Sequence, residues 1–207
     1  MFTGIVAAIG TINTVVSLSD QTDAGLRLTI DAGALAMNDV ALGDSIAING
    51  ACMTVVSKTG QQFCIDISRE SLNLTCGLDR PGSVNLEKAL TLADHIGGHL
   101  VSGHVDGLGT VIKFDTVNES VELVISAPKK LAKYLAYKGS IVVNGVSLTV
   151  NRVTDFADRC EFSINLIPHT LQMTTLKYLH IGDKVNLEID LIARYVERMM
   201  SVGQMVG

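Results

Sequence analysis

The chain has no tryptophan, no run of basic residues and no long apolar stretch. Its 16 Lys and Arg are outnumbered by 21 Asp and Glu, which gives a formal net charge of -5 at pH 7. Because phosphate recognition requires clustered Lys and Arg, this composition argues against a nucleic-acid partner. No stretch reaches the roughly 20 apolar residues of a membrane helix, and the amino terminus lacks the positive flank of a signal peptide. We therefore expect a cytoplasmic protein with no membrane partner.

Cysteine is also scarce, with four residues in 207. Cys52, Cys64, Cys76 and Cys160 show no CxxC spacing, so the sequence suggests neither a zinc site nor a disulfide framework. We expect reduced thiols and no bound metal. Hydrophobic residues make up 47% of the chain, which is enough to bury the core of one large or two small domains.

The sequence does contain a repeat. The segment "NGACMTV" begins at Asn49 and "NGVSLTV" begins at Asn144, and six of the eleven positions are identical between residues 45–55 and 140–150. Three further matches follow in the same order along the chain: residues 2–11 with 101–110, 67–75 with 166–174, and 83–87 with 184–188. Co-linear matches of this kind indicate an internal duplication.

Within each copy the local pattern is that of β-strands. Short runs rich in Val, Ile, Leu and Thr are separated by Gly, Asn and Asp at a spacing of roughly 8 to 12 residues. About six strands per copy, closed on themselves, would leave no exposed sheet edge. We therefore predict an all-β fold of two tandem six-stranded antiparallel barrels, over residues 1–96 and 97–189, with short helices and a helical tail over 190–207.

Two helices are predicted. The first spans residues 127–139, with Pro128 near its start and Gly139 at its end, and the second spans 191–200. The second carries four apolar residues at helical spacing, opposite two arginines: Ile192, Tyr195, Val196 and Met199. This stripe either packs onto the chain's own barrel or forms an oligomer contact.

Six co-linear motifs carry a family resemblance. The segments are "MFTGIV", "GDSIAINGACMTV", "IGGHLVSGHVDG", "YKGSIVVNGVSLTV", "LIPHTL" and "GDKVNLEID", and together they extend over nearly the whole chain. They resemble riboflavin synthase, in which one 6,7-dimethyl-8-ribityllumazine transfers a four-carbon unit to a second. The products are riboflavin and 5-amino-6-ribitylamino-2,4-pyrimidinedione.

The resemblance also implies an assembly. It implies a homotrimer tied together by carboxy-terminal helices, with each active site between the first barrel of one subunit and the second barrel of its neighbour. It implies no cofactor and no metal, and it suggests lumazine synthase as a further partner. Holding two substrates face to face would turn a two-molecule encounter into a positioned step.

Cys52 and Ser147 mark the position at which the two copies differ chemically. A free cysteine is usually a small buried hydrophobe, but the resemblance favours a role for Cys52 in ring contact, nucleophilic attack or acid-base chemistry. Ser147 can donate or accept a hydrogen bond but is a far weaker nucleophile. The difference predicts a donor pocket and an acceptor pocket with unlike duties.

Three further residues carry candidate chemistry. A lone histidine in a β-segment is more often structural, but the resemblance favours His104 as the base that removes the acidic 7-methyl proton of one lumazine. We expect His99 to be structural. Lys138 is either a solvated surface lysine or a group that polarises a pyrimidine carbonyl.

The remaining candidates would bind substrate. Asn144 belongs to an Asn-Gly hairpin turn and needs no function for that, so only hydrogen bonding is expected of it. Aromatic residues are only 4% of the chain, which leaves Phe2 either as a plug or as a stacking partner for the ring. Cys52, His104, Ser147 and Lys138 are thus the candidate catalytic residues. The expected substrate-binding set comprises Phe2, Gly4, Ile5, Val6, Ser45, Met53, Thr54, Asp66, Ile67, Glu70, Ser71, Gly103, Val105, Asn144, Leu148, Thr149, Asn165, Leu166, Ile167, Pro168, His169 and Thr170.

Two other functions compete with this one. A non-catalytic relative of the lumazine-protein type would bind a lumazine or flavin on the same barrels, but the presence of Cys52 and His104 favours the enzyme. A flavin-binding reductase would require a nicotinamide-binding unit with GxGxxG, and the sequence has none.

Overall fold

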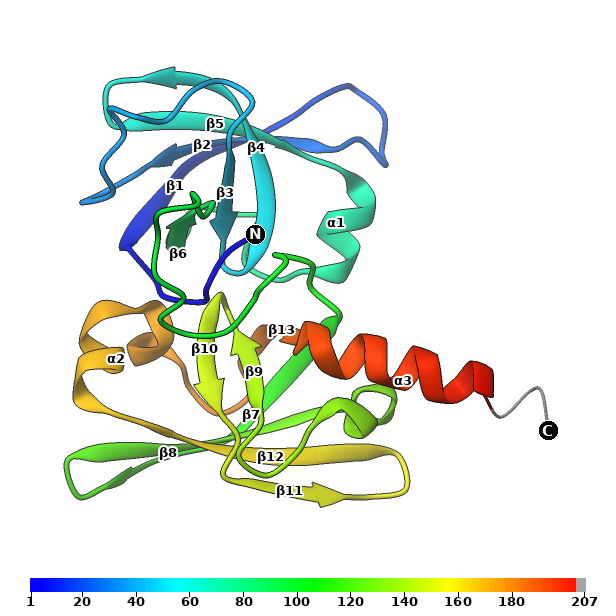
Figure 1. Ribbon diagram of the computed structural model, residues 1–207. Helices are drawn as coiled ribbons and strands as arrows, with labels where there is room; N and C mark the ends of the chain where they lie inside the picture. The colour runs from blue at the N-terminus through cyan, green and yellow to red at the C-terminus, as the bar shows by residue number, and fades with distance from the viewer. Residues whose placement is uncertain (204–207) are drawn as a thin grey trace.

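The first copy forms a closed antiparallel barrel, as predicted. In the computed structural model, which describes residues 1–203, the strand order around it is β1-β2-β5-β4-β3-β6, and β6 closes onto β1 (Figure 1). Its core consists of apolar side chains that alternate along the strands. The six strands are β1 (Ala8–Ser17), β2 (Leu26–Asp31), β3 (Ser45–Ile48), β4 (Ala51–Thr59), β5 (Gln62–Ile67) and β6 (Gly82–Lys88).

The second copy forms a curled sheet of seven strands in the order β10-β9-β13-β7-β8-β12-β11. The additional strand arises because β10 and β11 together correspond to the single strand β4. In β4 the register shifts between Val55 and Ser57, and the gap between β10 and β11 falls at the matching place. The strands are β7 (Gly107–Val117), β8 (Ser120–Pro128), β9 (Ser140–Val143), β10 (Val146–Thr149), β11 (Arg152–Asp155), β12 (Arg159–Leu166) and β13 (Lys184–Ile189).

Alternation along β4 and β10 decides which side chains can reach a ligand. Met53 is buried in the first core and Leu148 in the second, whereas the residues on either side of them point outward. Cys52 and Thr54 therefore share the outer face of β4, because side chains two apart on a strand project to one side. Ser147 and Thr149 share the outer face of β10 in the same way.

The two Asn-Gly turns lie against each other at the boundary between the barrels. Asn49 and Gly50 have φ of 46° and 83°, and Asn144 and Gly145 have φ of 47° and 82°, as a two-residue hairpin with both central φ positive requires. A Cβ on Gly50 would lie 2.8 Å from the backbone nitrogen of Gly145. Glycine is therefore required at both positions, for conformation and for contact.

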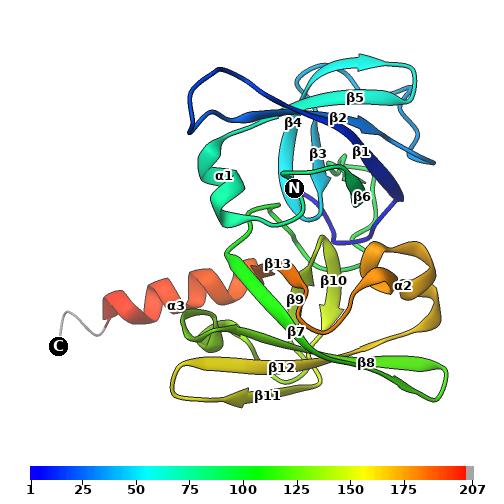
Figure 2. The same ribbon diagram turned by 180° about the vertical axis from the view of Figure 1, so that it is seen from behind.

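The helices are few and short, and one of them was predicted too long. Instead of a helix over 127–139, the chain continues β8 through Pro128, where it pairs with Arg159 of β12, and then forms one 3-10 helix. Figure 2 shows α1 and α2 flanking the region between the barrels. The helical elements are α1 (Arg69–Leu74), η1 (Lys129–Tyr134), α2 (Pro168–Met173), η2 (Thr175–Tyr178) and α3 (Leu191–Gly203). None of the described helices is long and apolar enough to cross a membrane.

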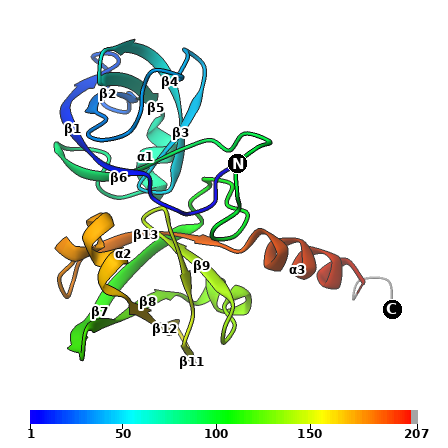
Figure 3. The same cartoon turned by 60° about the vertical axis from the view of Figure 1, so that its left-hand side comes forward.

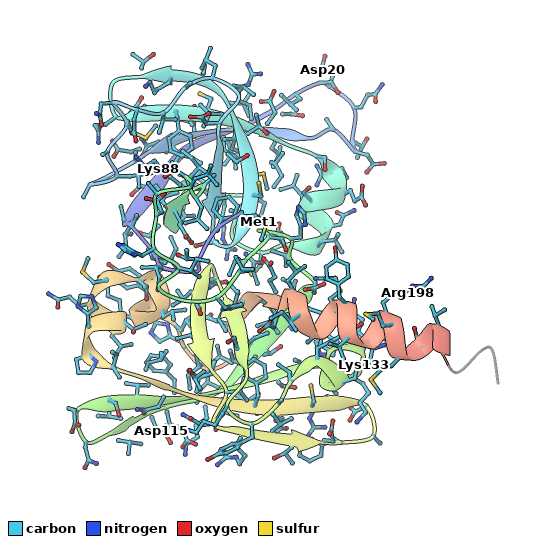
Figure 4. All side chains as sticks on the ribbon, in the orientation of Figure 1. Met1, Asp20, Lys88, Asp115, Lys133 and Arg198 are labelled. Atoms are coloured by element: carbon cyan, nitrogen blue, oxygen red, sulfur yellow. The ribbon has the colours of Figure 1, made fainter. Side chains whose placement is uncertain are left out.

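Helix α3 projects away from both barrels (Figure 3). Its polar face holds it to its own chain, because Arg194 donates to Asp106 at 2.8 Å and Glu197 accepts from Lys133 and Tyr134. Figure 4 shows Lys133 beneath the helix. Its apolar stripe is exposed, so the interpretation in which this stripe packs onto the chain's own barrel is wrong. The exposed fractions are 67% for Ile192, 63% for Tyr195, 49% for Val196 and 76% for Met199.

Candidate functional site

The starting segment of each copy crosses to the other barrel. Phe2 and Val101 form an antiparallel bridge, with main-chain hydrogen bonds of 2.8 and 3.0 Å, where the segments pass each other. Beyond the bridge, Ser147 N donates to Gly4 O at 2.7 Å. Each copy's start thus supplies main-chain groups to the site strand of the other copy. Figure 4 shows Met1 in front of the lower part of the first barrel.

The equivalent contact on the first barrel brings the two main candidates together. Cys52 N donates to Gly103 O at 2.8 Å, and His104 is the next residue. Cys52 is partly exposed and His104 is exposed, so both side chains can meet a ligand. Within residues 1–203 no hydrogen bond to Cys52 Sγ is found. The first site therefore combines a thiol from one copy with an imidazole from the other.

Two buried glutamates hold these crossing segments. Glu188, 2% exposed, accepts hydrogen bonds from Ser102 N at 2.7 Å, Ser102 Oγ at 2.8 Å, Gly103 N at 2.9 Å and His104 N at 3.0 Å. Burial raises the pKa of Glu188, although these hydrogen bonds act in the opposite direction. A carboxylate that only accepts fixes the path of the main chain up to His104.

Glu87 repeats this arrangement for the first copy. It accepts from Thr3 N at 2.6 Å, Thr3 Oγ1 at 2.7 Å and Gly4 N at 3.0 Å. Burial raises its pKa as well, again against the effect of the hydrogen bonds. The "VNLE" motif of each copy therefore ends in the residue that anchors its own starting segment.

The first site continues along the same barrel surface. Ser45 of β3 pairs with Thr54 of β4, and β5 leads from Asp66 into α1, whose first turn carries exposed Glu70 and half-buried Ser71. Arg27 donates to both carboxylate oxygens of Asp66 at 2.7 Å, and these bonds hold the pKa of Asp66 below its usual range. Asp66 is thus an ionised, already paired acceptor.

The second site has the same layout and different chemistry. Ser147 and Thr149 face outward, β12 ends near exposed Asn165, and α2 begins with Pro168 and carries exposed His169. A neutral amide and an imidazole thus replace the two carboxylates of the first site. Among the other predicted residues, Ile167 is the N-cap of α2 and Thr170 lies within it, while Ile5 lies in the starting segment of the first copy. Val6 packs against the second core and Val105 against the first.

The structure places some predicted residues away from these surfaces. Phe2 is 0% exposed and packs between the barrels beside Cys52, as a plug would. Asn144 is buried, with its Oδ1 accepting from Asn186 N at 2.8 Å. The side chains of Met53, Ile67, Leu148 and Leu166 lie in the two cores, so only their main chain can contact a ligand.

Lys138 lies at the outer end of the second site. Its N–H donates at 2.8 Å to the O of Val150, the residue that follows β10, and its Nζ donates to Asn151 Oδ1 at 3.3 Å. The residue has φ of 63° where the first copy has Gly43. The exposed ammonium group can therefore reach solvent or a ligand beyond Thr149.

Sequence reasoning missed one contact at the second site. His99 Nδ1 lies 2.8 Å from Ser147 Oγ, although His99 belongs to the linker between the barrels and was expected to be structural. The double glycine of "GGHL" is the signal that could have revealed it, since a Cβ on Gly98 would lie 2.9 Å from Ser147 Oγ. Because the main chain at Gly98 passes so close to Ser147, the side chain of the next residue, His99, comes into contact with Ser147.

A cavity of about 750 Å³ between the barrels was also not anticipated, and it lies apart from Cys52 and His104. Its lining includes Asn49 and Asn144 of the two Asn-Gly turns, together with Cys76, Arg80 and Tyr178. Burial raises the pKa of the Cys76 thiol to about 11, so this thiol is protonated and unreactive at neutral pH. No group of His, Cys, Asp or Glu in residues 1–203 is arranged to hold a metal ion.

Two segments of the chain, 3–89 and 102–190, match the lumazine binding domain family. The riboflavin synthase of Photobacterium phosphoreum is 42% identical over 204 residues, which cover 98% of this chain and 90% of that protein. The riboflavin synthase of Mycobacterium bovis is 44% identical over 97% of this chain and 98% of its own length. The riboflavin synthase of Bacillus subtilis is 39% identical over 97% of this chain and 90% of its own length.

Solved structures of a similar fold contain ligands. LumP complexed with riboflavin superimposes with a TM-score of 0.78 at 29% identity, and covers 91% of this chain and 99% of its own. LumP complexed with 6,7-dimethyl-8-(1'-D-ribityl) lumazine has a TM-score of 0.77 at 28% identity over the same shares. The identity to these structures is lower than to the three synthases.

Proposed function

Because the chain belongs to the riboflavin synthase family, with two lumazine-binding repeats, we propose that it is a riboflavin synthase. One 6,7-dimethyl-8-ribityllumazine would transfer a four-carbon unit to a second, giving riboflavin and 5-amino-6-ribitylamino-2,4-pyrimidinedione. The main support for this proposal is the similarity to named riboflavin synthases, which extends over nearly the full length of this chain and of the Mycobacterium bovis synthase. The dismutation is internally balanced, since one molecule gains what the other loses, and requires no external oxidant.

The two sites would perform different parts of this reaction. We assign His104 as the base that accepts the 7-methyl proton of one lumazine, with the Cys52 thiol beside it for nucleophilic or acid-base help. At the second site the Ser147 hydroxyl would bind the ring, and Lys138 would polarise a carbonyl. Glu70 and Ser71 on α1, and His169 and Thr170 on α2, would hold the ribityl chain or the pyrimidine edge.

We further propose that the reacting pair forms between subunits. The first site of one chain would face the second site of its neighbour in a homotrimer, which would position two ring systems together. The exposed stripe of α3 supplies an apolar surface for such an assembly, since the barrels leave four large side chains of one helix face uncovered. The proposal also places the domain boundary between residues 96 and 97. It further includes a location in the cytoplasm and contact with lumazine synthase.

Replacing Met199 with aspartate tests the role of α3. A carboxylate on the stripe would have to be buried in the helix contact, so we expect the trimer to dissociate into monomers and turnover to fall with it. Analytical ultracentrifugation gives the mass, and the same samples give the rate. Arg198→Ala, on the opposite face of the helix, is the matched control. A Met199→Asp protein that remained trimeric would exclude α3 as the assembly contact.

The activity itself is tested with 6,7-dimethyl-8-ribityllumazine as the sole substrate. The purified chain is expected to convert it to riboflavin, followed by the flavin absorption band, with one pyrimidinedione formed for each riboflavin. Binding of the lumazine without conversion would contradict the synthase proposal. That result would instead favour a ligand-binding protein of the LumP type.

A further inference from the structure

The linker between the barrels contacts the second site over residues 97–99. His99 N donates to Thr3 O at 3.2 Å, which ties this part of the linker to the crossing segment of the first copy. A Cβ on Gly98 would lie 2.2 Å from Thr3 O and 2.8 Å from Ser147 Cβ. Only glycine lets the linker come this close, so the contact between His99 and Ser147 is built into the local backbone.

The two nitrogens of the His99 ring have different surroundings. Nδ1 is 2.8 Å from Ser147 Oγ, whereas Nε2 is buried and has no hydrogen-bond partner among the described residues. Neutral imidazole carries one N–H, so each tautomer leaves a different group at Nε2. Burial lowers the pKa of His99, an effect that the Asp190 carboxylate opposes, which is consistent with a neutral ring.

The buried, unpartnered Nε2 selects between the two tautomers. If Nδ1 accepted the Ser147 proton, Nε2 would carry an N–H in a buried place with no acceptor, and orphaned buried N–H groups are rare in folded proteins. If Nδ1 carries the proton instead, it donates to Ser147 Oγ and leaves only a lone pair at Nε2. The tautomer with the proton on Nδ1 is therefore favoured, because an unpaired lone pair at Nε2 costs less free energy than a buried N–H without an acceptor.

We propose that His99 is a positioning residue that donates its Nδ1–H to Ser147 Oγ and thereby directs the Ser147 hydroxyl hydrogen outward as a donor. This rests on the proposed function, and it gives the second site a defined preference. The site selects a ligand that presents a hydrogen-bond acceptor, such as a ring carbonyl or an unprotonated ring nitrogen, opposite Ser147. Ser147 then binds and orients the ring but is not activated as a nucleophile, because among residues 1–203 no proton acceptor faces its hydroxyl.

The first site has no equivalent device. No hydrogen bond to Cys52 Sγ is found in the described part of the chain, and the linker passes beside Ser147 alone. The difference between the pockets is therefore larger than the exchange of sulfur for oxygen. One pocket holds a free thiol on a strand whose main chain is bonded to the residue before His104, and the other holds a hydroxyl fixed in direction by a buried imidazole.

The test compares four variants in the full-length protein: His99→Ala, His99→Asn, Ser147→Ala and the double variant His99→Ala with Ser147→Ala. We expect His99→Ala to raise the KM for 6,7-dimethyl-8-ribityllumazine about tenfold with a smaller change in kcat, since an orienting hydrogen bond is lost. His99→Asn can place an amide N–H at the same point and should stay within about threefold of the unaltered protein. In the double variant, loss of His99 should add less than twofold to the effect of Ser147→Ala. His95→Ala, an exposed histidine of the same linker, is the matched control.

A spectroscopic measurement makes the outcome independent of turnover. In protein labelled with ¹⁵N at histidine, the His99 ring should show the Nδ1–H tautomer, and a ring with the proton on Nε2 would overturn the proposal. The proposal would also be overturned if the KM of His99→Asn rose as much as that of His99→Ala. It would equally be overturned if His99→Ala raised the KM by the same factor in the presence and in the absence of the Ser147 hydroxyl. If the unaltered protein fails to make riboflavin, the synthase proposal falls, while the tautomer and the effect of His99→Ala on riboflavin binding still decide the role of His99.

Discussion

Replacing Cys52 with alanine is expected to lower turnover by about 100-fold or more while the barrels stay folded. The side chain faces outward from β4 beside Gly103 and His104, so its removal leaves no cavity in either core. Loss of a positioned nucleophile or proton-transfer group typically costs about 100-fold to 10,000-fold in rate. The rate of riboflavin formation and the free energy of unfolding in guanidinium chloride measure the two effects separately.

Two further variants sharpen this expectation. Cys52→Ser keeps a polar group of similar size but a far weaker nucleophile, so we expect a rate between those of the alanine variant and the unaltered protein. Cys64→Ala, a partly exposed thiol on neighbouring β5, should leave the rate unchanged. Full activity in Cys52→Ser would show that sulfur chemistry is not used at this position.

Replacing Glu188 with alanine is expected to cost about 3 to 5 kcal/mol of unfolding free energy and most of the activity. Three main-chain N–H groups, those of Ser102, Gly103 and His104, would lose their acceptor at a largely buried place. Each unsatisfied group costs about 1 to 3 kcal/mol, less whatever water recovers. Because the same bonds fix the main chain up to His104, the segment that carries this imidazole would lose its fixed path past Cys52. Denaturation curves and the rate at a temperature where the variant is folded give both values.

The chain offers two controls for this change. Glu87→Ala should lose similar stability, but it frees the segment beside Ser147 and leaves the path to His104 intact. Glu119→Ala, at the exposed turn between β7 and β8, should change the unfolding free energy by less than about 0.5 kcal/mol. Near-normal stability in Glu188→Ala would mean that water replaces the carboxylate at the crossing.

The sequence predicted the features that depend on local pattern. The duplication, the strands and the two Asn-Gly turns follow from alternation, turn chemistry and repeated letters, and the structure contains all three. Alternation also placed Cys52 and Thr54 on one strand face. The predicted helix over 127–139 was too long. Residues 127 and 128 belong to β8 and pair with β12, since long-range pairing overrides a local helical preference, and only Lys129–Tyr134 form a helix, of the 3-10 type.

The site could not be assembled from the sequence because its parts come from opposite copies. No periodic pattern says that Val101 will pair with Phe2, or that the last residue of "VNLE" is a buried anchor and not a surface glutamate. The contact of His99 with Ser147 was missed for a related reason. A linker residue has no matching position in the duplicated domains, so comparison of the two copies says nothing about where its side chain lies.

The contacts between the barrels occur in reciprocal pairs. Asn85 Nδ2 donates to Asn144 O at 2.8 Å, and Asn186 Nδ2 donates to Asn49 O at 3.0 Å, just as the two starting segments exchange places. Such reciprocity is the mark of an isologous dimer, in which one patch meets its own copy across a two-fold axis. The chain therefore has the internal design of a symmetric dimer whose halves have been joined by a linker. In a dimer of identical chains every substitution appears on both sides of the axis; joining the halves is what permits sulfur at one site and oxygen at the other.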